Sequence, residues 1–552
     1  MASQPPNERP NVVLIMADDM GFSDLFGSEI ETPNLDQLGQ NGIRLTQMYN
    51  CARCCPSRAS LLTGLYPHQA GIGHMVHDND SEDTAYQGYL RKDVATIAEI
   101  LRDIGGYKTY MAGKWHVGGE YPPHLPQHWM EKAGDKQHPL PVQRGFDEHY
   151  GTLGGGGSYY DPPSLIHDNT IILDTPDDYY YTDAINDHAC RMIQEAMKDD
   201  EPFFLYVAHV APHWPLHAPE NVIAKYRGKY RDGGWDKLRQ QRFESLQKEE
   251  LIQKGWRLSP RNEHGVAWET VQHKDWEDAR MATYGAMIDV MDQGIGRILT
   301  FLKDQGVFDN TMIIFLSDNG GCAEYLKEGG EVARWPEFYG GIASDGTRTV
   351  VGNDPTRMPG GRDSFMSYDL PWANASNTPF RLFKSWVHEG GIATPCLVHW
   401  PNGIKNPGSI HHHPWIMMDI VATCYDVCGV EYPESYKGKA LPKLEGVSFR
   451  PIFLDDQAER HTPMFWEHQG NRAVRHGKWK LVYAEHQSDN WELYDMDVDR
   501  TELCNLATQQ PERAQHMANM WEEWAIRCQV RPWPLNEIPK GEKDWAHYPW
   551  NW

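Results

Sequence analysis

Short apolar runs alternate along the chain with longer segments in which apolar residues recur at helical spacing. The first run, NVVLIMA, begins at residue 11, and four similar runs follow it. Runs that are apolar throughout are typical of strands buried on both faces, and helices between them cover those faces. The pattern predicts an α/β fold built on a large sheet, with strands at residues 11–17, 107–113, 203–208, 311–316 and 395–399.

Two of the intervening segments are predicted helices. Residues 96–104 begin with Thr96 and Glu99 at the spacing of a capping box, and Gly105 follows the last turn. Residues 279–303 keep a helical period over too great a length for a loop. In contrast, residues 328–376 are rich in Gly, Asp and Pro, so we predict a long excursion near the functional site.

After about residue 445 the pattern changes to short strands separated by turns. We predict strands at residues 462–467, 471–474, 478–483 and 492–495. A helix that opens at Pro511 then carries four large apolar residues on one face: Met517, Met520, Trp521 and Trp524. Because 552 residues exceed one ordinary core, we predict a large domain at 1–445 and a smaller α+β subdomain, an antiparallel sheet packed by a helix, at 446–552.

Composition narrows the range of partners. The chain has 77 acidic and 52 basic side chains and a formal net charge of −25, which disfavours nucleic acid and anionic membrane surfaces. No run reaches the roughly 20 apolar residues of a membrane span. We expect a soluble protein, cytoplasmic as the sequence stands, or periplasmic or secreted if a signal peptide has been removed. The sequence makes no prediction of the oligomeric state.

Polar residues follow two of the predicted strands directly. Asp18 and Asp19 come after the first strand, and Asp318 and Asn319 follow the fourth. In open α/β sheets, ligands bind at the carboxyl ends of the strands. Three carboxylates and an amide at one edge repel one another unless a cation lies among them, and hard oxygen ligands favour calcium or magnesium. The alternative is a pair of helix N-caps, which accounts for one residue of each pair.

Lysines and histidines follow the other strands. Strand alternation places Lys114 and His116, after the second strand, on the same face. His213 lies in a proline-bounded loop just past the third strand, where a histidine is more often structural or exposed. Lys384 precedes a His-Glu-Gly-Gly turn that starts at His388, and taken alone it is a solvated charge.

The segment CCPSRASLLTG, which begins at Cys54, has the pattern of a helix start, because Pro56 suits a first turn. Arg58 then lies one turn after Cys54 on the same face of the helix. Cys51 and Cys54 also have the spacing of a redox Cys-x-x-Cys pair.

Other cysteines and histidines have alternative interpretations. A zinc site would need a second pair of ligands near Cys51 and Cys54, and Cys424 and Cys428 are weak candidates. Cys55 is expected to be a packing residue. The run of histidines at residues 411–413 is expected to form a surface turn and not a metal tract.

Six motifs of the chain occur in the order found in type I sulfatases. They are DD, C-x-P-S-R, G-K-W-H, P-H-W-P, S-D-N-G and K-x3-H-E-G-G. Over residues 10 to about 505 the chain resembles this formylglycine-dependent family, and it is most similar to bacterial arylsulfatases of the alkaline-phosphatase-like superfamily. The resemblance implies a large mixed sheet between helices and a smaller C-terminal sheet. It also implies hydrolysis of a sulfate monoester, with an aryl or carbohydrate leaving group.

Carried over residue by residue, the resemblance makes Cys54 the precursor of formylglycine. A maturation enzyme forms this aldehyde, and its hydrate attacks the sulfur of the sulfate ester. The resemblance further implies that the formylglycine and four other residues bind calcium: Asp18, Asp19, Asp318 and Asn319. Asp318 would also accept the proton of the attacking hydroxyl.

The resemblance assigns catalytic roles to five more residues. Lys114 and Lys384 would hold sulfate oxygens and stabilise the charge that develops on them. Arg58 would orient the hydrate. His213, together with Lys384, would protonate or stabilise the leaving group, and His116 would take a proton as sulfate departs.

Two other functions stay open. A phosphonate monoester or phosphodiester hydrolase of the same fold shares the nucleophile signature, although the GKWH, SDNG and Lys384 pattern fits sulfatases better. A catalytically silent binding protein would keep the fold, but every polar position that matches the family is present. The negative charge of the chain favours a small anionic ester or a sulfated oligosaccharide over a long polysulfated polymer.

Overall fold

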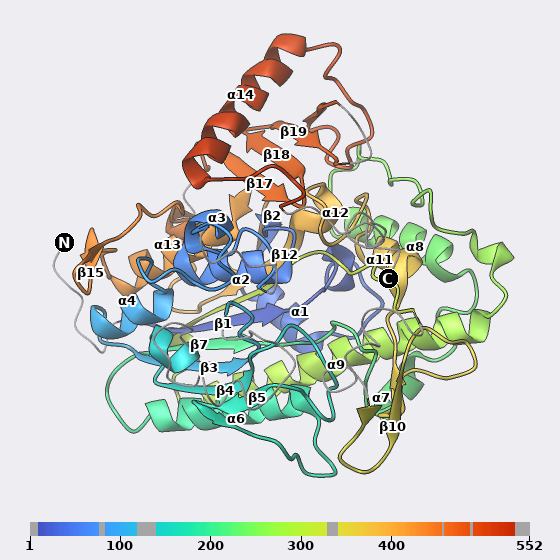
Figure 1. Cartoon of the computed structure of the whole chain (residues 1–552), viewed down its shortest axis with the longest axis horizontal. Coiled ribbons are helices and arrows are strands. Elements are labelled where there is room, and N and C mark those ends of the chain that lie inside the picture. The colour runs from blue at the N-terminus through green and yellow to red at the C-terminus, as the bar shows by residue number, and fades with distance from the viewer. Residues whose placement is uncertain are drawn as a thin grey trace.

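The computed structural model describes residues 9–76, 83–118, 140–327, 341–454, 458–485 and 490–535. A mixed sheet of 11 strands crosses the molecule between two layers of helices (Figure 1). The strands follow one another across the sheet in the order β13 (Ser409–His411), β2 (Ile43–Tyr49), β12 (Ala393–His399), β8 (Thr311–Ser317), β1 (Asn11–Ala17), β7 (Phe203–Ala208), β3 (Lys108–Gly113), β4 (Glu148–Thr152), β5 (Leu165–His167) and β6 (Thr170–Ile171), and β14 (Trp415–Ile416) pairs with β2.

The centre of the sheet is parallel. β1 pairs with β7 on one side and with β8 on the other, so that Val13 lies opposite Leu205 and Ile313. β12 runs antiparallel to β8 and β2, and β5 runs antiparallel to β4. The sheet is therefore mixed, and all five predicted strands are present, with β3 beginning at Lys108 and β12 at Ala393.

Alternate residues of β1 pack on opposite faces of the sheet. Val13 and Ile15 belong to one apolar core, and Val12 and Leu14 belong to the other. The first core is covered by α1 (Pro33–Gln40), α6 (Tyr181–Ala196), α7 (Glu220–Tyr226) and α9 (Lys274–Asp304). The second is covered by α2 (Cys54–Thr63), α4 (Ile97–Asp103) and α13 (Met417–Cys428), on the opposite side of the sheet (Figure 1). This burial explains why every residue of β1 after Asn11 is apolar.

The predicted helix at residues 96–104 corresponds to α4. Thr96 Oγ1 accepts a hydrogen bond from Glu99 N at 3.1 Å, and the Glu99 carboxylate accepts one from Thr96 N at 2.9 Å. This pair of bonds is the predicted capping box. The predicted helix at residues 279–303 is the larger part of α9.

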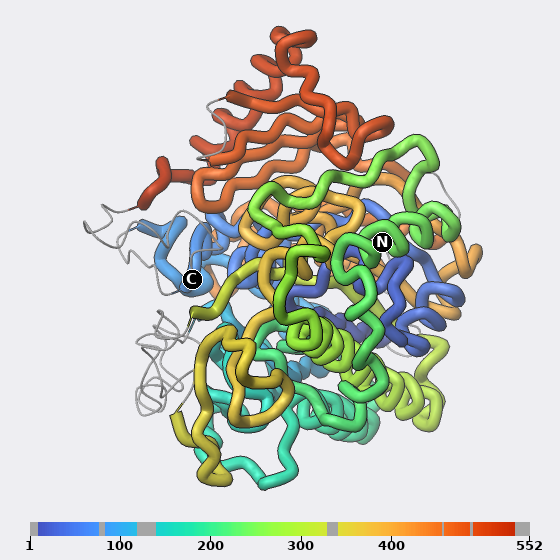
Figure 2. Tube along the Cα trace, turned by 90° about the vertical axis from the view of Figure 1, so that its right-hand side faces the viewer, coloured from blue at the N-terminus to red at the C-terminus, as the bar shows by residue number. Residues whose placement is uncertain are grey.

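The small C-terminal sheet lies at one end of the molecule, at the top of both views (Figure 1, Figure 2). It is antiparallel and consists of β17 (Met464–His468), β18 (Asn471–His476), β19 (Trp479–Tyr483) and β20 (Glu492–Asp495). α14 (Pro511–Cys528) packs on it through the predicted apolar face, on which Met520 is half-buried and three residues are buried: Met517, Trp521 and Trp524. The prediction of an antiparallel sheet packed by a helix is confirmed.

The predicted excursion at residues 328–376 lies partly outside the described residues, which resume at 341. Its described part forms β9 (Gly341–Ile342), β10 (Arg348–Val351), β11 (Ser364–Phe365) and α11 (Asp369–Ser376). α11 packs against α8 (Gly234–Lys248). A further strand pair, β15 (Ser435–Tyr436) and β16 (Lys439–Ala440), follows α13.

Two strands at one end of the large sheet do not show the apolar pattern. β2 carries polar residues, and Thr46 Oγ1 lies 2.9 Å from Nδ1 of His412. The prediction of a surface turn at residues 411–413 is only partly correct, because His411 belongs to β13, which pairs with β2, whereas His412 and His413 follow the strand and His412 is exposed. β13 is at the edge of the sheet and only partly buried, so its sequence does not need to be apolar, whereas β2 is mostly buried and pairs its polar residues with neighbouring groups.

Candidate active site

Several segments of the chain meet at one edge of the large sheet. β1, β3, β7 and β8 are parallel, so their carboxyl ends lie together. β12 is antiparallel to β8, so its first residue, Ala393, and the preceding α12 (Glu389–Ile392) reach the same edge. Tyr49 at the end of β2 lies opposite Ala393, which also brings the start of α2 to this edge. The topology thus gathers the polar residues that the sequence places at strand ends.

The predicted cation ligands form one buried cluster. Asp18 and Asp19 follow β1, Asp318 and Asn319 follow β8, and all four are at most 1% exposed. Asp19 N donates to Asp318 Oδ1 at 3.2 Å, and Asn319 Nδ2 donates to Asp19 Oδ1 at 2.7 Å. Burial, together with the charge of Asp18, raises the pKa of Asp318 well above its ordinary value.

Two oxygens of this cluster have no hydrogen-bond partner in the described part of the chain. They are Asp18 Oδ1 and Asn319 Oδ1, and both are buried. Buried polar atoms are nearly always hydrogen-bonded or bound to an ion. Because the donor set consists of carboxylate and amide oxygens, it fits a hard divalent cation such as calcium.

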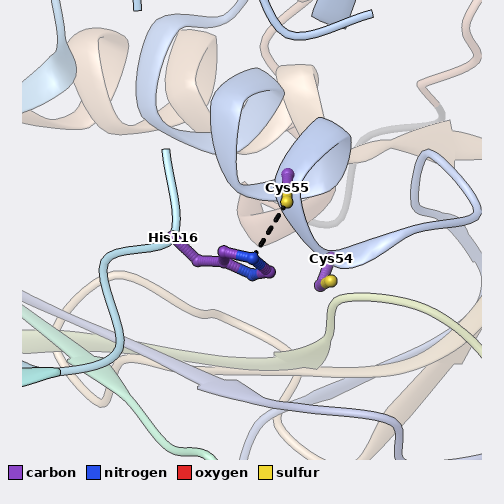
Figure 3. A group of neighbouring side chains, drawn as sticks. All are labelled: Cys54, Cys55 and His116. Carbon is purple, nitrogen blue, oxygen red and sulfur yellow. Dashed lines mark hydrogen bonds between the residues drawn. The ribbon is translucent and has the colours of Figure 1, made fainter. Parts of the chain in front are cut away.

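Cys54 is the first residue of α2, beside this cluster. Figure 3 shows Cys54 and Cys55 on the first turn of the helix, with the imidazole of His116 facing them. The two sulfurs and a His116 ring nitrogen lie within 4.8 Å of one another. A hydrogen bond from Cys55 lowers the pKa of the Cys54 thiol well below its ordinary value despite burial, and the charges of nearby Lys114 and Lys384 act in the same direction. The surroundings therefore favour an anionic group at position 54.

Arg58 lies one turn after Cys54 and is fully buried. Its Nε and Nη2 atoms donate to Asp318 Oδ2 at 3.2 and 2.8 Å, and Nη2 also lies 3.2 Å from Asp18 Oδ2. Nη1 donates to the carbonyl of Lys114 at 3.2 Å. Arg58 therefore connects α2 to the ends of β1, β8 and β3.

The two lysines reach the cluster from opposite parts of the chain. The Lys114 ammonium donates to Asp18 Oδ2. Lys384 Nζ lies 2.7 and 3.0 Å from the two carboxylate oxygens of Asp19. Burial alone would lower the pKa of Lys384, but the charge of Asp19 raises it well above its ordinary value. Both lysines thus carry buried positive charges at the site.

His213 and His116 contact different residues of the site. His213 Nε2 is 3.5 Å from Asp19 Oδ2, and burial lowers the pKa of His213 although the charge of Asp19 opposes this. His116 Nε2 is 3.2 Å from the sulfur of Cys55, and burial lowers the pKa of His116 to about 4. The interpretation of Cys55 as a packing residue therefore omits its contact with His116.

The expectation that strand alternation sets the face of His116 is wrong. β3 ends at Gly113, and His116 has a φ angle of 52°, in the left-handed region that non-glycine residues rarely adopt. Such a backbone is typical of residues that the surrounding fold holds at functional sites. The turn directs Lys114 toward Asp18 and His116 toward Cys55.

A second layer of polar contacts beside Cys54 is not indicated by the sequence. Arg53 forms an ion pair with Glu324 at 2.9 Å and donates to Ser385 Oγ at 2.6 Å. Trp214 Nε1 donates to the other oxygen of Glu324 at 2.8 Å. The sequence gives two weak signals of these contacts: Arg53 directly precedes Cys54, and Ser385 directly follows Lys384. Taken alone, each charged residue has the pattern of a solvated group.

The cysteines of the zinc alternative do not meet at this site. Within the described ranges, two clusters of three residues have the spacing of metal ligands, and neither includes Cys424 or Cys428. These two cysteines are buried in α13, and burial raises the pKa of Cys428 to about 12. Cys51 donates to Ser60 Oγ at 3.4 Å, and burial raises its pKa to about 12 as well.

The fold and the buried charges define a class of enzyme. A mixed sheet between helices, with a carboxylate cluster at its edge and a small C-terminal sheet, is the architecture of alkaline-phosphatase-like hydrolases. The family described as "Sulfatase" matches residues 10–430, and the family described as "N-sulphoglucosamine sulphohydrolase, C-terminal" matches residues 380–527. The chain therefore belongs to the sulfatase family, as a type I sulfatase, and it is a sulfuric ester hydrolase.

Relatives and solved structures are similar over nearly the whole chain. An uncharacterised sulfatase of Schizosaccharomyces pombe is 32% identical over 548 residues, which covers 94% of each chain. An arylsulfatase of Klebsiella aerogenes is 32% identical over 461 residues, or 81% of this chain and 92% of the relative. The crystal structure of Ps i-CgsB has a TM-score of 0.64 at 25% identity and covers 94% of this chain and 93% of the other.

Among the described residues, no helix combines the length and the apolar character that crossing a bilayer requires.

Proposed function

We propose that this sulfatase hydrolyses sulfate monoesters with a formylglycine formed from Cys54 and a calcium ion. The calcium ligands would be the formylglycine and four residues: Asp18, Asp19, Asp318 and Asn319. The observation that best supports this proposal is the pair of buried oxygens without a partner in the described chain, one on Asp18 and one on Asn319, beside Cys54. A magnesium ion would use the same oxygen ligands but prefers a more regular octahedral geometry.

The cation and the modified residue each supply one element of the chemistry. A bound calcium ion would polarise a sulfate oxygen as a Lewis acid. A formylglycine would supply an aldehyde hydrate, with one hydroxyl for attack and a second for release of sulfate. A formylglycine-generating maturation enzyme is therefore a required partner of this chain.

The protein's own residues would bind the sulfate group and move protons. Lys114 and Lys384 carry buried ammonium groups beside the carboxylates, where they would bind sulfate oxygens. Asp318 would accept a proton at its carboxylate, and Arg58 would hold that carboxylate in place while orienting the group at position 54.

The two histidines would act on opposite sides of the reacting bond. His213 Nε2, which faces Asp19, would donate a proton or a hydrogen bond to the leaving oxygen. His116 is neutral near pH 7 because burial lowers its pKa to about 4, so its ring can accept a proton as sulfate departs. The leaving group would be a phenol or a carbohydrate, in a small sulfate ester or a sulfated oligosaccharide.

Replacement of the precursor residue tests the mechanism. We expect Cys54→Ala to reduce kcat for 4-nitrophenyl sulfate by at least about 10⁴-fold, because the nucleophile is absent. The variant should keep the calcium-dependent rise in unfolding temperature, since four oxygen ligands remain. Cys51→Ala is the matched control, because Cys51 is a nearby buried cysteine outside the proposed machinery, and it should retain near-normal turnover.

Mass spectrometry of the peptide that contains residue 54 tests the conversion directly. Active protein should contain an aldehyde at this position, and active protein with only the thiol would contradict the proposal. Turnover of phenyl phosphonate at a higher kcat/KM than phenyl sulfate would instead favour the phosphonate monoester or phosphodiester hydrolase. Tight binding of sulfate esters without any turnover would favour a silent binding protein.

A further inference from the structure

His468 is a buried histidine to which the proposed mechanism assigns no role. It ends β17, and the turn between β17 and β18 runs from His468 to Asn471. The residue is 0% exposed, yet neither ring nitrogen has a hydrogen-bond partner among the described residues. The ring of His74 stacks on it, with centroids 5.2 Å apart and planes at 12°, so it covers the face of the imidazole and not its edge. Unpaired buried nitrogens of this kind indicate a missing partner.

The β17–β18 hairpin is docked on the segments that carry the active site. Asn471 Nδ2 donates to the carbonyl of Ser385 at 3.4 Å and to the carbonyl of His468 at 3.1 Å. Ser385 follows Lys384, and its hydroxyl accepts a hydrogen bond from Arg53, the residue before Cys54. The turn that holds His468 is therefore connected to both sides of the site.

The strand itself also faces this region. Trp466 lies two residues before His468, so the two side chains project from the same face of β17. Trp466 Nε1 donates to the carbonyl of Asn50 at 2.8 Å, which attaches that face to the segment leading into Cys54. The charges of Arg53 and Cys54 are both near enough to act on the His468 ring. His468 is thus a contribution of the C-terminal sheet to the surroundings of Cys54.

The chemistry of the ring limits what it can bind. Burial lowers the pKa of His468 well below its ordinary value, so the imidazole is neutral near pH 7. A neutral imidazole offers one donor and one acceptor. A hydroxyl group can accept a hydrogen bond from the N–H or donate one to the other nitrogen, whereas a bare phenyl ring can do neither. An acidic group is a poorer match, because the nearby positive charge of Arg53 is already paired with Glu324.

We propose that His468 is a specificity residue that hydrogen-bonds a hydroxyl of the leaving group, so that the preferred substrates are carbohydrate sulfates and not simple aryl sulfates. The inference rests on the proposed sulfatase mechanism and adds the class of leaving group. His468 takes no part in attack on sulfur. Its loss should therefore reduce discrimination between substrates without abolishing the chemistry.

The experiment compares kcat/KM for 4-nitrophenyl sulfate with kcat/KM for the monosulfates of glucose, galactose and N-acetylglucosamine. We expect converted wild-type protein to prefer at least one sugar sulfate. His468→Ala should lower kcat/KM for that sugar by about 10- to 100-fold, because a hydroxyl of the sugar loses its partner, and should change the value for the aryl sulfate by less than about 3-fold. His468→Asn, which keeps a donor and an acceptor, should restore part of the sugar activity.

His399→Ala is the matched control. His399 is buried, its Nδ1 also lacks a partner among the described residues, and it ends β12 at the opposite edge of the sheet. This control should leave the ratio of the two activities unchanged. Equal losses on both substrates in His468→Ala, no loss on either, or a wild type that hydrolyses only the aryl sulfate would each overturn the inference while leaving the proposed mechanism in place. A converted wild type that hydrolyses no sulfate ester would overturn both.

Discussion

Arg58 illustrates how the charges of the site depend on one another. Its guanidinium donates to Asp318 at 2.8 Å and to Asp18 at 3.2 Å, and all three side chains are fully buried. A buried ion pair is not stabilising by itself, because both charges lose their hydration. Removal of one partner is nevertheless costly, because the other charge stays buried and uncompensated. Arg58 therefore affects the stability of the site as well as its chemistry.

We predict that Arg58→Ala lowers the free energy of unfolding by about 3–5 kcal/mol, since Asp18 and Asp318 lose their shared partner. Arg58→Lys keeps the charge but lacks the planar fork, so it should lose less stability and still lose most of kcat. Urea unfolding of the two variants, with and without added calcium, measures the difference. Calcium should restore part of the stability of Arg58→Ala, because the cation would neutralise the same carboxylates.

An exposed arginine serves as the control for this prediction. Arg227 pairs with Glu220 on the surface, where both side chains are largely exposed. Pairs of this kind contribute at most about 1 kcal/mol, so Arg227→Ala should unfold close to the wild type. If Arg58→Ala unfolded at the same urea concentration as Arg227→Ala, the ion pairs of Arg58 with Asp18 and Asp318 would not stabilise the folded protein, and the prediction would be wrong.

The sequence predicts the residues whose position follows from a strand end. Asp18 and Lys114 meet in the structure because β1 and β3 end at one edge of the sheet. Lys384 contacts Asp19 at the same place, but only the family resemblance indicated it. Cys55 and His468 could not be predicted in this way. The direction of the Cys55 sulfur depends on the turn at His116, and the place of His468 depends on how a distant hairpin docks. The catalytic roles stay predictions, because a geometry alone does not measure them.

At the scale of elements, strand prediction succeeded where burial on both faces forces an apolar run. β1, β7 and β8 lie at the centre of the sheet, and their burial explains the pattern. β13 lies at the end of the sheet, where a partly buried strand does not need an apolar sequence. β2, the next strand, is mostly buried but contains polar residues such as Thr46, so its sequence also gives little indication of a strand. The helix of residues 279–303 was predicted because its period persists over many turns.

The connection between β8 and α12 leads to the prediction at this scale. A side chain at Gly320 would place its Cβ 1.8 Å from the carbonyl oxygen of Gly390. No real Cβ contact is that short, so Gly320→Ala must separate the end of β8 from α12. We expect a loss of about 3 kcal/mol in the free energy of unfolding and a large loss of turnover, because Asn319 moves with the strand end. Thermal unfolding and kcat for an aryl sulfate measure the two effects.

Gly255→Ala is the control for this substitution. The Cβ added at Gly255 has no heavy atom of the described chain within 4 Å, so its effect should stay within about 0.5 kcal/mol. A Gly320→Ala variant as stable and active as Gly255→Ala would contradict the tight contact between β8 and α12.

At the scale of the whole molecule, buried charges connect the C-terminal sheet to the large sheet. Glu389 of α12 pairs with Lys480 of β19 at 2.9 Å and with Arg500 at 2.6 Å. Lys480 also pairs with Glu502 at 2.8 Å, and Tyr49 of β2 donates to Glu389 at 2.9 Å. These contacts join residues that are far apart in sequence, so no local pattern predicts them. The division of the chain at residue 445 stays a prediction, and this network is where the two parts would meet.

The pKa of Glu389 makes the network sensitive to acid. Burial alone would raise this pKa, but the charges of Lys480 and Arg500 outweigh it and lower the pKa to about 2 from an ordinary value of 4.5. A carboxyl whose pKa is lower in the folded state binds its proton more readily when unfolded. Its contribution to stability is therefore complete above pH 4.5 and is lost as the pH falls from there toward 2. The size of this contribution is about 3 kcal/mol.

We predict that Glu389→Gln lowers the free energy of unfolding by at least that amount at neutral pH, and that the difference from the wild type shrinks steadily as the pH falls through the same window. Urea unfolding followed by tryptophan fluorescence at a series of pH values measures it. Glu220→Gln, at an exposed ion pair, should show almost no such trend, because solvent screens its charge. A constant difference between wild type and Glu389→Gln across the window would mean that Glu389 acts by packing alone, and that its charge does not hold the two sheets together.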